Sequence, residues 1–298
     1  MRFSVWPTTR QSWDDFFDLA VHAEATGWDG IWVADHFMPA APPLDVPTLE
    51  CWAVLGALAA SVPRVRIGSL VASNTYRHPA VLANMAATVD QLSGGRLVLG
   101  IGAGWQENEH RAYGITLPPV RERLARLEEA CEVLRGLLDR PRTTFHGRFY
   151  ELLDAPLDPK PLQQPLPLLV GGGGERVTLR IAARWADEWN TWGTPDVLAR
   201  KGAVLDRHCH AVGRDPATIR RSAQAVVVPA DPALALAPSA GWPATIGGSA
   251  SELRELMAAY VAAGVDEFVV PDWNAGRGQA RRDFFDWFAA EVAAGFRR

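Results

Sequence analysis

A carboxylate and a histidine stand directly after an apolar run near the start of the chain, where a buried strand normally meets a turn. Asp35-His36-Phe37 follows the apolar residues 30–33. An imidazole exchanges protons near neutral pH more readily than other side chains, so we expect His36 to donate or accept a proton in a reaction. The alternative interpretation is a loop-capping Asp35 beside a packed histidine.

Small and polar residues follow a later apolar run, in the segment ASNTYRHPA at 72–80. Ala72 and Ser73 leave room for a flat ligand against the backbone, and Asn74 offers both a hydrogen-bond donor and an acceptor. An ordinary loop before a helix that begins near Pro79 explains the same residues. Both interpretations stay open at this point.

Glycines at alternate positions mark the third stretch, GIGAGWQENEH at 100–110. The run is not a dinucleotide-binding fingerprint, because its third glycine comes one position early and it lies in the fourth strand–helix unit. We instead expect the backbone of Ala103 and Gly104 to lie close to a planar ring, with Trp105 as a wall. Polar groups nearby come from Glu107, Asn108 and Glu109.

Four consecutive glycines form the last stretch: Gly171, Gly172, Gly173 and Gly174, followed by Glu175 and Arg176. Free N–H groups at the start of a helix bind phosphate, so we expect the glycines to open a helix and to cradle a phosphate group. A plain turn is the alternative, although four glycines carry a cost in conformational entropy. Together the four stretches predict a phosphorylated planar redox cofactor with His36 at its ring end.

Eight apolar runs alternate with amphipathic segments and predict the elements that position these residues. Runs with little polar alternation indicate strands that are buried on both faces, as in a parallel sheet. Eight such units in 298 residues predict a single-domain (β/α)8 TIM barrel over residues 1–298, and an open doubly wound sheet is the alternative. We expect insertions after strand 4, at about 139–166, and after strand 7, at 229–248. The expected strands cover residues 2–6, 30–34, 64–72, 96–102, 166–171, 188–192, 222–228 and 266–271.

The overall composition excludes several classes of protein. The net charge is −4 and no run of Lys and Arg lies on one helix face, so nucleic acid and anionic membranes are not expected partners. No apolar segment reaches the ~18 residues of a membrane-spanning helix, and the N-terminus lacks the pattern of a signal peptide. Three widely spaced cysteines predict reduced thiols in the cytoplasm. No metal site is expected at His208-Cys209-His210, because neighbouring helix positions face different directions.

Several of these segments resemble the luciferase-like monooxygenase superfamily and, within it, the coenzyme F420-dependent oxidoreductases of actinobacterial type. The matching segments are ADHF (34–37), YRHPAVLANMAATVDQLSGGRLVLGIGAGW (76–105), ENEHRAYGI (107–115) and VGGGGERVTLRIAARWADEWN (170–190). The second segment is long and specific. The likeness covers most of the chain and weakens across 229–248.

The resemblance implies a barrel that binds coenzyme F420, a deazaflavin, or FMN at the carboxyl ends of its strands. It places a non-prolyl cis peptide bond within Leu70-Val71-Ala72, as a bulge behind the central ring of the cofactor. In such enzymes hydride transfer is the reaction that a deazaflavin favours.

The resemblance also implies roles for individual side chains. His36 matches the family's histidine beside the reactive carbon, and Asp35 would contact the ring edge. The glycine loop 171–174, with Glu175 and Arg176, would hold the phosphate. Asn108 matches the family's asparagine in the strand-four loop.

Two departures from the family pattern bear on the substrate. The acidic residue that follows the strand-four glycines in the sugar-phosphate dehydrogenases is Trp105 here, and an aromatic residue of the strand-two loop is Ala40. The expected substrate is therefore a small, more apolar molecule rather than glucose 6-phosphate. The leading hypothesis is a homodimeric F420-dependent oxidoreductase. The alternatives are an FMN-dependent monooxygenase, served by a separate flavin reductase, and a catalytically silent barrel that binds a ligand.

Overall fold

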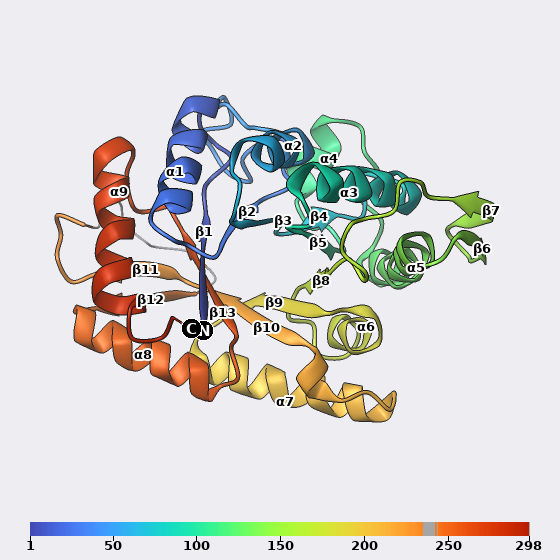
Figure 1. The fold of residues 1–298 in the computed structure, drawn as a ribbon. Coiled ribbons are helices and arrows are strands. Elements are labelled where there is room, and N and C mark those ends of the chain that lie inside the picture. The colour runs from blue at the N-terminus through green and yellow to red at the C-terminus, as the bar shows by residue number, and fades with distance from the viewer. Residues whose placement is uncertain (235–241, 243, 298) are drawn as a thin grey trace.

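The computed structural model describes residues 1–234, 242 and 244–297, which form a closed barrel of parallel strands surrounded by helices (Figure 1). The barrel closes because β3 pairs with β5, while β1 pairs with both β2 and β13. The predicted (β/α)8 barrel is confirmed, and the open doubly wound sheet is wrong because the described barrel strands leave no open edge. The barrel strands are β1 (Arg2–Trp6), β2 (Gly30–Val33), β3 (Arg66–Ser69) continued by β4 (Ala72–Ser73), β5 (Leu97–Gly102), β8 (Leu168–Gly171), β9 (Glu188–Trp192), β10 (Arg220–Gln224) and β13 (Glu267–Pro271).

A helix follows each barrel strand, and the ends of several helices match signals in the sequence. Ser12 caps α1, and Ser249 forms a capping box with Glu252 at the start of α8. Pro79 begins α3, and Gly94 ends it in a left-handed conformation. The barrel helices are α1 (Trp13–Ala25), α2 (Cys51–Ser61), α3 (Pro79–Ser93), α5 (Val120–Asp139), α6 (Thr178–Trp185), α7 (Pro195–Ala211), α8 (Ala250–Ala262) and α9 (Gly278–Trp287), which continues as a π-helix (Phe288–Ala293).

The first addition to the barrel is an antiparallel hairpin after α5. Its strands are β6 (Arg142–His146) and β7 (Glu151–Pro156), and the hairpin projects from one side of the molecule (Figure 1). The hairpin lies within the insertion predicted at 139–166.

The second addition differs from the prediction. The expected seventh strand, 222–228, is two strands, and the second of them, β11 (Val226–Pro229), pairs with β12 (Thr245–Gly248) instead of with a barrel strand. Of the insertion predicted at 229–248, residues 235–241 and 243 lie outside the described residues.

A short helix, α4 (Glu107–Ala112), lies between β5 and α5 and is absent from the predicted elements. Six residues are too few to display a helical hydrophobic period. Two of its residues, Glu109 and His110, are nonetheless buried.

The interior of the barrel is charged at the amino ends of its strands. Arg66 binds Glu188 at 2.5 Å and Glu267 at 3.0 Å, and both carboxylates are almost fully buried. A cavity of about 310 Å³ opens at this end, and its lining includes Arg2 and Arg220.

The interior becomes apolar toward the carboxyl ends of the strands. The parallel register places Ser4, Val269, Gln224 and Trp192 in one row of β1, β13, β10 and β9. Trp6 follows Ser4 by two residues, so its side chain lies on the same face, nearer the carboxyl ends. The inner apolar cluster comprises Trp6, Trp32, Leu70, Val98, Leu169 and Val269, with Ala34, Val71, Trp192 and Trp273 packed against it and partly exposed.

Within residues 1–234, 242 and 244–297, no helix is long and apolar enough to cross a lipid bilayer. No group of three or more His, Cys, Asp or Glu side chains in these ranges is arranged to hold a metal ion. In the segment 208–210, His208 donates to the carbonyl oxygen of Glu175 at 2.8 Å, Cys209 is buried and His210 is exposed. These three side chains therefore face different surroundings.

Candidate active site

The four stretches singled out in the sequence all lie at the carboxyl ends of barrel strands. Residues 35–37 follow β2, 72–74 contain the end of β4, 103–108 follow β5 and 172–176 follow β8. In a closed parallel barrel these ends share one rim, which is where TIM-barrel enzymes bind their substrates. The fold therefore brings together residues that are up to 141 positions apart, from Asp35 to Arg176 (176 − 35 = 141).

His36 is held by a buried carboxylate from α4. Its Nδ1 lies 2.7 Å from Oε1 of Glu109, whose side chain is fully buried, whereas the His36 side chain is 25% exposed. The N–H of Phe37 donates to the other carboxylate oxygen at 2.8 Å, and the hydroxyl of Tyr76 donates to Oε1. An ionised carboxylate only accepts hydrogen bonds, so Nδ1 of His36 carries the proton and Nε2 is the acceptor in the neutral ring.

The electrostatics keep this carboxylate ionised. Burial by itself raises the pKa of Glu109. The hydrogen bonds from His36, Tyr76 and Phe37 together lower this pKa by a larger amount, so the net shift is downward. The pKa of Tyr76 is raised by burial and by the same carboxylate, so its phenol remains a donor. The sequence named Glu109 only as a nearby polar group, because a short helix gave no sign that it turns toward His36.

Trp105 lies beside the imidazole, as expected of a wall. Its ring centroid is 5.5 Å from that of His36, with the two planes at 80°, and its side chain is 61% exposed. An exposed indole at a rim offers apolar surface to a ligand without a folding role of its own.

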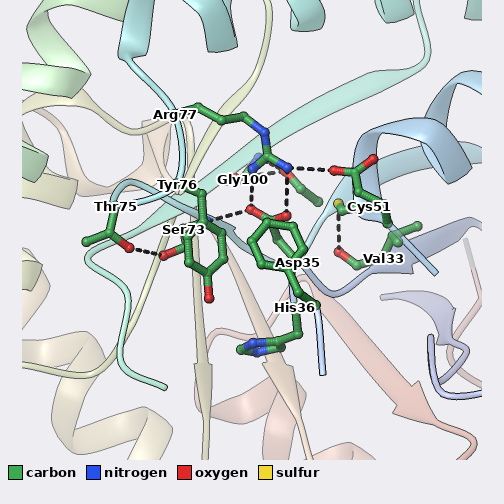
Figure 2. A network of polar contacts seen from close by, with 12 residues as sticks. Val33, Asp35, His36, Cys51, Ser73, Thr75, Tyr76, Arg77 and Gly100 are labelled. Atoms are coloured by element: carbon green, nitrogen blue, oxygen red, sulfur yellow. Dashed lines mark hydrogen bonds and ion pairs between the residues drawn. The ribbon is translucent and has the colours of Figure 1, made fainter. Parts of the chain in front are cut away.

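Asp35 is held by contacts within the chain. Its carboxylate is buried and accepts hydrogen bonds from the guanidinium of Arg77 at 2.7 and 3.1 Å and from the N–H of Ser73 at 2.9 Å. Figure 2 shows this carboxylate directed toward Arg77, and the imidazole of His36 directed away from it. Arg77 also binds Glu50 at 2.6 Å. Asp35 therefore joins the end of β2 to β4, and its contact with a cofactor ring stays a prediction.

The peptide bond between Leu70 and Val71 is cis, as the resemblance implied. The glycines around it explain how Val71 fits. A Cβ atom on Gly102 would lie 2.7 Å from Cγ2 of Val71, and one on Gly171 would lie 2.8 Å from Cγ1. A Cβ atom on Gly100 would lie 2.0 Å from the carbonyl oxygen of Ser69. Close packing against Ser69 and Val71 by itself requires glycine at these three positions, and the role of Gly171 in a phosphate cradle stays a prediction.

A chain of hydroxyl groups runs from β4 to α4. Nδ1 of His110 lies 2.6 Å from the carbonyl oxygen of Gln106, so it is the donor, and Nε2 of the neutral ring accepts from Thr75 at 2.7 Å. Thr75 in turn accepts from Ser73 at 2.7 Å. Gly104 has φ of +77°, and a Cβ atom there would lie 2.7 Å from Oγ of Ser73. The lone pairs of Ser73 are therefore the free acceptors at this point of the rim.

The two asparagines differ in their surroundings. Asn74 donates to the hydroxyl of Tyr150 at 3.2 Å, and its Oδ1 is buried without a hydrogen-bond partner. Asn108 donates to the carbonyl oxygen of Pro39 at 2.8 Å, so it holds the loop after β2. Asn74 thus keeps a free acceptor, and a contact of Asn108 with a cofactor stays a prediction.

The glycine loop does not open a helix. Gly171 ends β8, Gly172 has φ of +126°, and α6 begins only at Thr178, after a turn at 175–177. The prediction that the glycines open a helix is wrong, because the turn at 175–177 separates them from α6. Next to the loop, Lys201 of α7 donates to the carbonyl oxygen of Gly173 at 2.5 Å and lies 3.6 Å from Glu175.

Two cations near this loop were missed in the sequence, and a third was anticipated. Lys201 and Arg200 both bind Glu175 and both lie on α7. Arg200 follows Glu175 by 25 residues in the sequence. Arg176 is exposed beside the glycines. The only available signal was that Lys201 is one of two lysines in the chain.

The chain matches the model of the luciferase-like monooxygenase family over residues 1–240. It is 42% identical over 173 residues to the F420-dependent glucose-6-phosphate dehydrogenase of Kineococcus radiotolerans, which covers 57% of this chain and 50% of the relative. The enzyme of the same name from Amycolatopsis mediterranei is 38% identical over 175 residues, or 58% and 51% of the two chains. The chain thus spans about half the length of the curated relatives that it matches.

Solved structures share the fold. An F420-dependent secondary alcohol dehydrogenase in complex with an F420-acetone adduct has a TM-score of 0.84 at 22% identity, over 100% of this chain and 99% of the other. The coenzyme F420-dependent tetrahydromethanopterin reductase of Methanopyrus kandleri has a TM-score of 0.83 at 17% identity, over 99% of both chains. With a family match that covers most of its length and a barrel of the same architecture, this chain belongs to the luciferase-like monooxygenase family.

Proposed function

We propose that the protein is an oxidoreductase that transfers a hydride between coenzyme F420 and a small, largely apolar organic molecule. The relatives at 42% and 38% identity are named as F420-dependent dehydrogenases. The observation that carries the proposal is the pairing of His36 with Glu109, which commits Nδ1 and leaves Nε2 of a partly exposed imidazole for another partner.

The rim fits a planar, anionic cofactor. Oδ1 of Asn74 is a buried acceptor without a partner, and Arg176 is an exposed cation beside a loop of glycine main chain. When bound, coenzyme F420 supplies a carbon that accepts or donates a hydride. We assign its ring to residues 72–74 and 103–105, backed by Leu70 and Val71, and its phosphate to residues 172–176 and Lys201.

His36 handles the proton that accompanies the hydride. In the direction of oxidation, Nε2 accepts the hydroxyl proton of an alcohol, because Nδ1 already carries the other ring proton. The imidazolium that results is stabilised by the Glu109 carboxylate, which stays ionised in its hydrogen-bonded site. In the direction of reduction, the same nitrogen returns the proton to a carbonyl oxygen.

The apolar character of the substrate is inferred from the residues around this position. Trp105 is 61% exposed next to His36, and Trp192 and Trp273 are partly exposed where the barrel interior meets the rim. Indole surfaces of this kind favour the apolar body of a ligand.

The cofactor is tested by titrating the apoprotein with coenzyme F420 and with FMN in parallel, and by following the fluorescence of its 12 tryptophans. We expect F420 to bind more tightly, and the bound coenzyme to be reduced on addition of an apolar secondary alcohol. Tighter binding of FMN, with oxygen consumption once the flavin is reduced, would support the FMN-dependent monooxygenase instead. Binding of neither cofactor would leave a ligand-binding barrel without catalysis.

Three further properties belong to the proposal. We expect one folded domain, a homodimer in solution and a cytoplasmic location, the last because Cys51, Cys131 and Cys209 are buried and free. Light scattering of the purified protein measures its mass, and a single cooperative unfolding transition would support one domain.

A further inference from the structure

We propose that Gln224 and Trp6 bind the polar group of the substrate at the carboxyl end of the barrel interior, and that this substrate is an uncharged molecule. The inference starts from two buried polar atoms that have no hydrogen-bond partner, Oε1 of Gln224 and Nε1 of Trp6. It rests on the proposed function only where it names the ligand as the molecule that exchanges the hydride.

Gln224 faces the interior of the barrel. Its neighbours in the sheet register are Trp192 and Val269, which pack in or against the inner apolar cluster. Two residues earlier on the same strand, Ser222 accepts a hydrogen bond from Asn190 at 2.9 Å in a buried contact. Since every second side chain of a strand shares a face, Gln224 lies above this pair on the same inner side.

Trp6 lies close to the same point. It is 6% exposed and Gln224 is 3% exposed. The centroid of the Trp6 ring is 5.7 Å from that of Trp192, the residue beside Gln224 in the sheet. The two residues that carry the unpartnered atoms are thus both neighbours of Trp192, where the barrel interior meets the rim.

Unpartnered buried polar groups are uncommon, because each costs about 1–3 kcal/mol. Polar side chains deeper in the same barrel do have partners: Ser222 binds Asn190, and Ser4 binds Glu267 at 2.6 Å. The amide oxygen of Gln224 accepts and the indole N–H of Trp6 donates. A hydroxyl group satisfies both atoms, since it donates once and accepts as well, and a carbonyl group keeps the bond from Trp6.

The barrel residues around Gln224 and Trp6 are uncharged, which argues against an anionic ligand. The inner residues nearest the rim carry no charged group: Trp6, Ala34, Leu70, Gly171, Trp192 and Gln224. Burying a phosphate or carboxylate here without a cation would carry a large desolvation cost.

The tryptophan side chains around this position suit the apolar part of a ligand. The ring of Trp273 lies 5.0 Å from Trp6, 5.3 Å from Trp192 and 4.6 Å from Trp242, measured between centroids. The ligand class that fits both the walls and the two polar atoms is an alcohol or ketone on a hydrocarbon or aromatic frame.

The test uses the full chain, with and without reduced coenzyme F420, and three probes: cyclohexanol, cyclohexanecarboxylate, which shares its ring but carries a charge, and glucose 6-phosphate. Binding is followed by tryptophan fluorescence and calorimetry for wild type, Gln224→Leu, Trp6→Phe and the control Ser222→Ala, whose hydroxyl has a partner. We expect cyclohexanol to bind in preference to both anions. Its hydroxyl donates to Gln224 and accepts from Trp6, so loss of either hydrogen bond should weaken its binding by about 3- to 10-fold in Gln224→Leu and in Trp6→Phe, with little change in Ser222→Ala.

A second measurement keeps the test independent of folding defects. Gln224→Leu removes a polar atom that has no partner, so we expect its Tm to be unchanged or raised, and its affinity for F420 to be unchanged. A lowered Tm, equal binding of cyclohexanol to both variants and wild type, or preference for an anion overturns the inference. If F420 does not bind but cyclohexanol binds with the expected dependence on Gln224, the proposed function fails and this subsite stands.

Discussion

Glu109 fixes which nitrogen of His36 carries the proton. Its buried carboxylate accepts three hydrogen bonds, one of them from Nδ1 of His36, so Nε2 is the acceptor of the neutral ring. The chemistry of the rim thus depends on a contact between residues that are 73 positions apart. His36 is therefore the group that we propose meets the substrate, and Glu109 and Tyr76 are the groups that position it.

Replacement of His36 by alanine tests the first role. Without the imidazole no side chain at this point accepts or returns the substrate proton. We expect kcat to fall by about 10²–10⁴, while the affinity for coenzyme F420 is retained. Stopped-flow reduction of the bound coenzyme measures the first quantity, and fluorescence titration measures the second. Unchanged turnover would remove His36 from the proposed mechanism.

Glu109→Gln tests the positioning role, with Glu107→Gln on the exposed side of the same helix as the control. The pKa of Glu109 is lowered in the folded state, so its stabilising contribution is present above its ordinary value and is lost as the pH falls through the lowered one. We expect the free energy of unfolding of wild type to fall more steeply between about pH 5 and pH 3 than that of Glu109→Gln. Urea unfolding across this pH range measures both free energies. An identical pH dependence for the two proteins would contradict the prediction.

The elements meet at a point where several of them need glycine. β5 contributes Gly100 and Gly102, β8 contributes Gly171, and all three make room for the connection between β3 and β4 at Ser69 and Val71. α4 then closes over the loop that follows β2, through Asn108 and Gln106, whose amides donate to the carbonyl oxygens of Pro39 and Met38. The rim is therefore a packed unit of several elements.

Gly102→Ala tests this packing. The new Cβ atom lies 2.7 Å from Cγ2 of Val71, so we expect a loss of about 1–3 kcal/mol in the free energy of unfolding and weaker binding of coenzyme F420. Gly56→Ala in α2 is the control, because nothing lies within 4 Å of its Cβ position, and we expect it to stabilise by about 0.5–1 kcal/mol. The double variant Gly102→Ala, Val71→Ala should recover most of the loss. No recovery would place the clash elsewhere.

The whole molecule divides its barrel interior between two environments. The amino end holds a buried ion-pair cluster of Arg66, Glu188 and Glu267, and the carboxyl end holds the tryptophan-lined row that meets the rim. The N-terminal amine donates to the carbonyl oxygen of Phe296 at 2.7 Å, so the two ends of the described chain lie side by side at the first of these regions (Figure 1). The proposed ligand site and the buried ion pairs thus lie at opposite ends of the barrel interior.

Arg66→Met tests the stabilising end. Removing the cation leaves two buried carboxylates without their partner, so we expect a loss of about 3–5 kcal/mol in the free energy of unfolding. The loss should shrink at acid pH, where Glu188 takes up a proton because burial raises its pKa, and in the triple variant Arg66→Met, Glu188→Gln, Glu267→Gln. Arg142→Met, which breaks an exposed pair with Asp154, is the control and should cost less than about 1 kcal/mol. A loss that does not depend on pH would point to packing instead of charge.

The sequence by itself indicated eight strands buried on both faces, with a closed barrel as the leading prediction, and it placed His36, Trp105 and the glycine loop at the carboxyl ends. Local signals such as Ser12 and Gly94 also located helix ends, since capping depends on neighbouring residues. The tertiary structure decided between the closed barrel and the open doubly wound sheet, through the pairing of β3 with β5, and it decided what the site residues touch. Glu109 meets His36, Asp35 turns to Arg77, and Lys201 reaches the glycine loop through contacts between distant segments that leave no local pattern. The glycines of β5 and β8 show the same limit: the sequence predicted close approach, and the fold brings Ser69 and Val71 of the same chain against them.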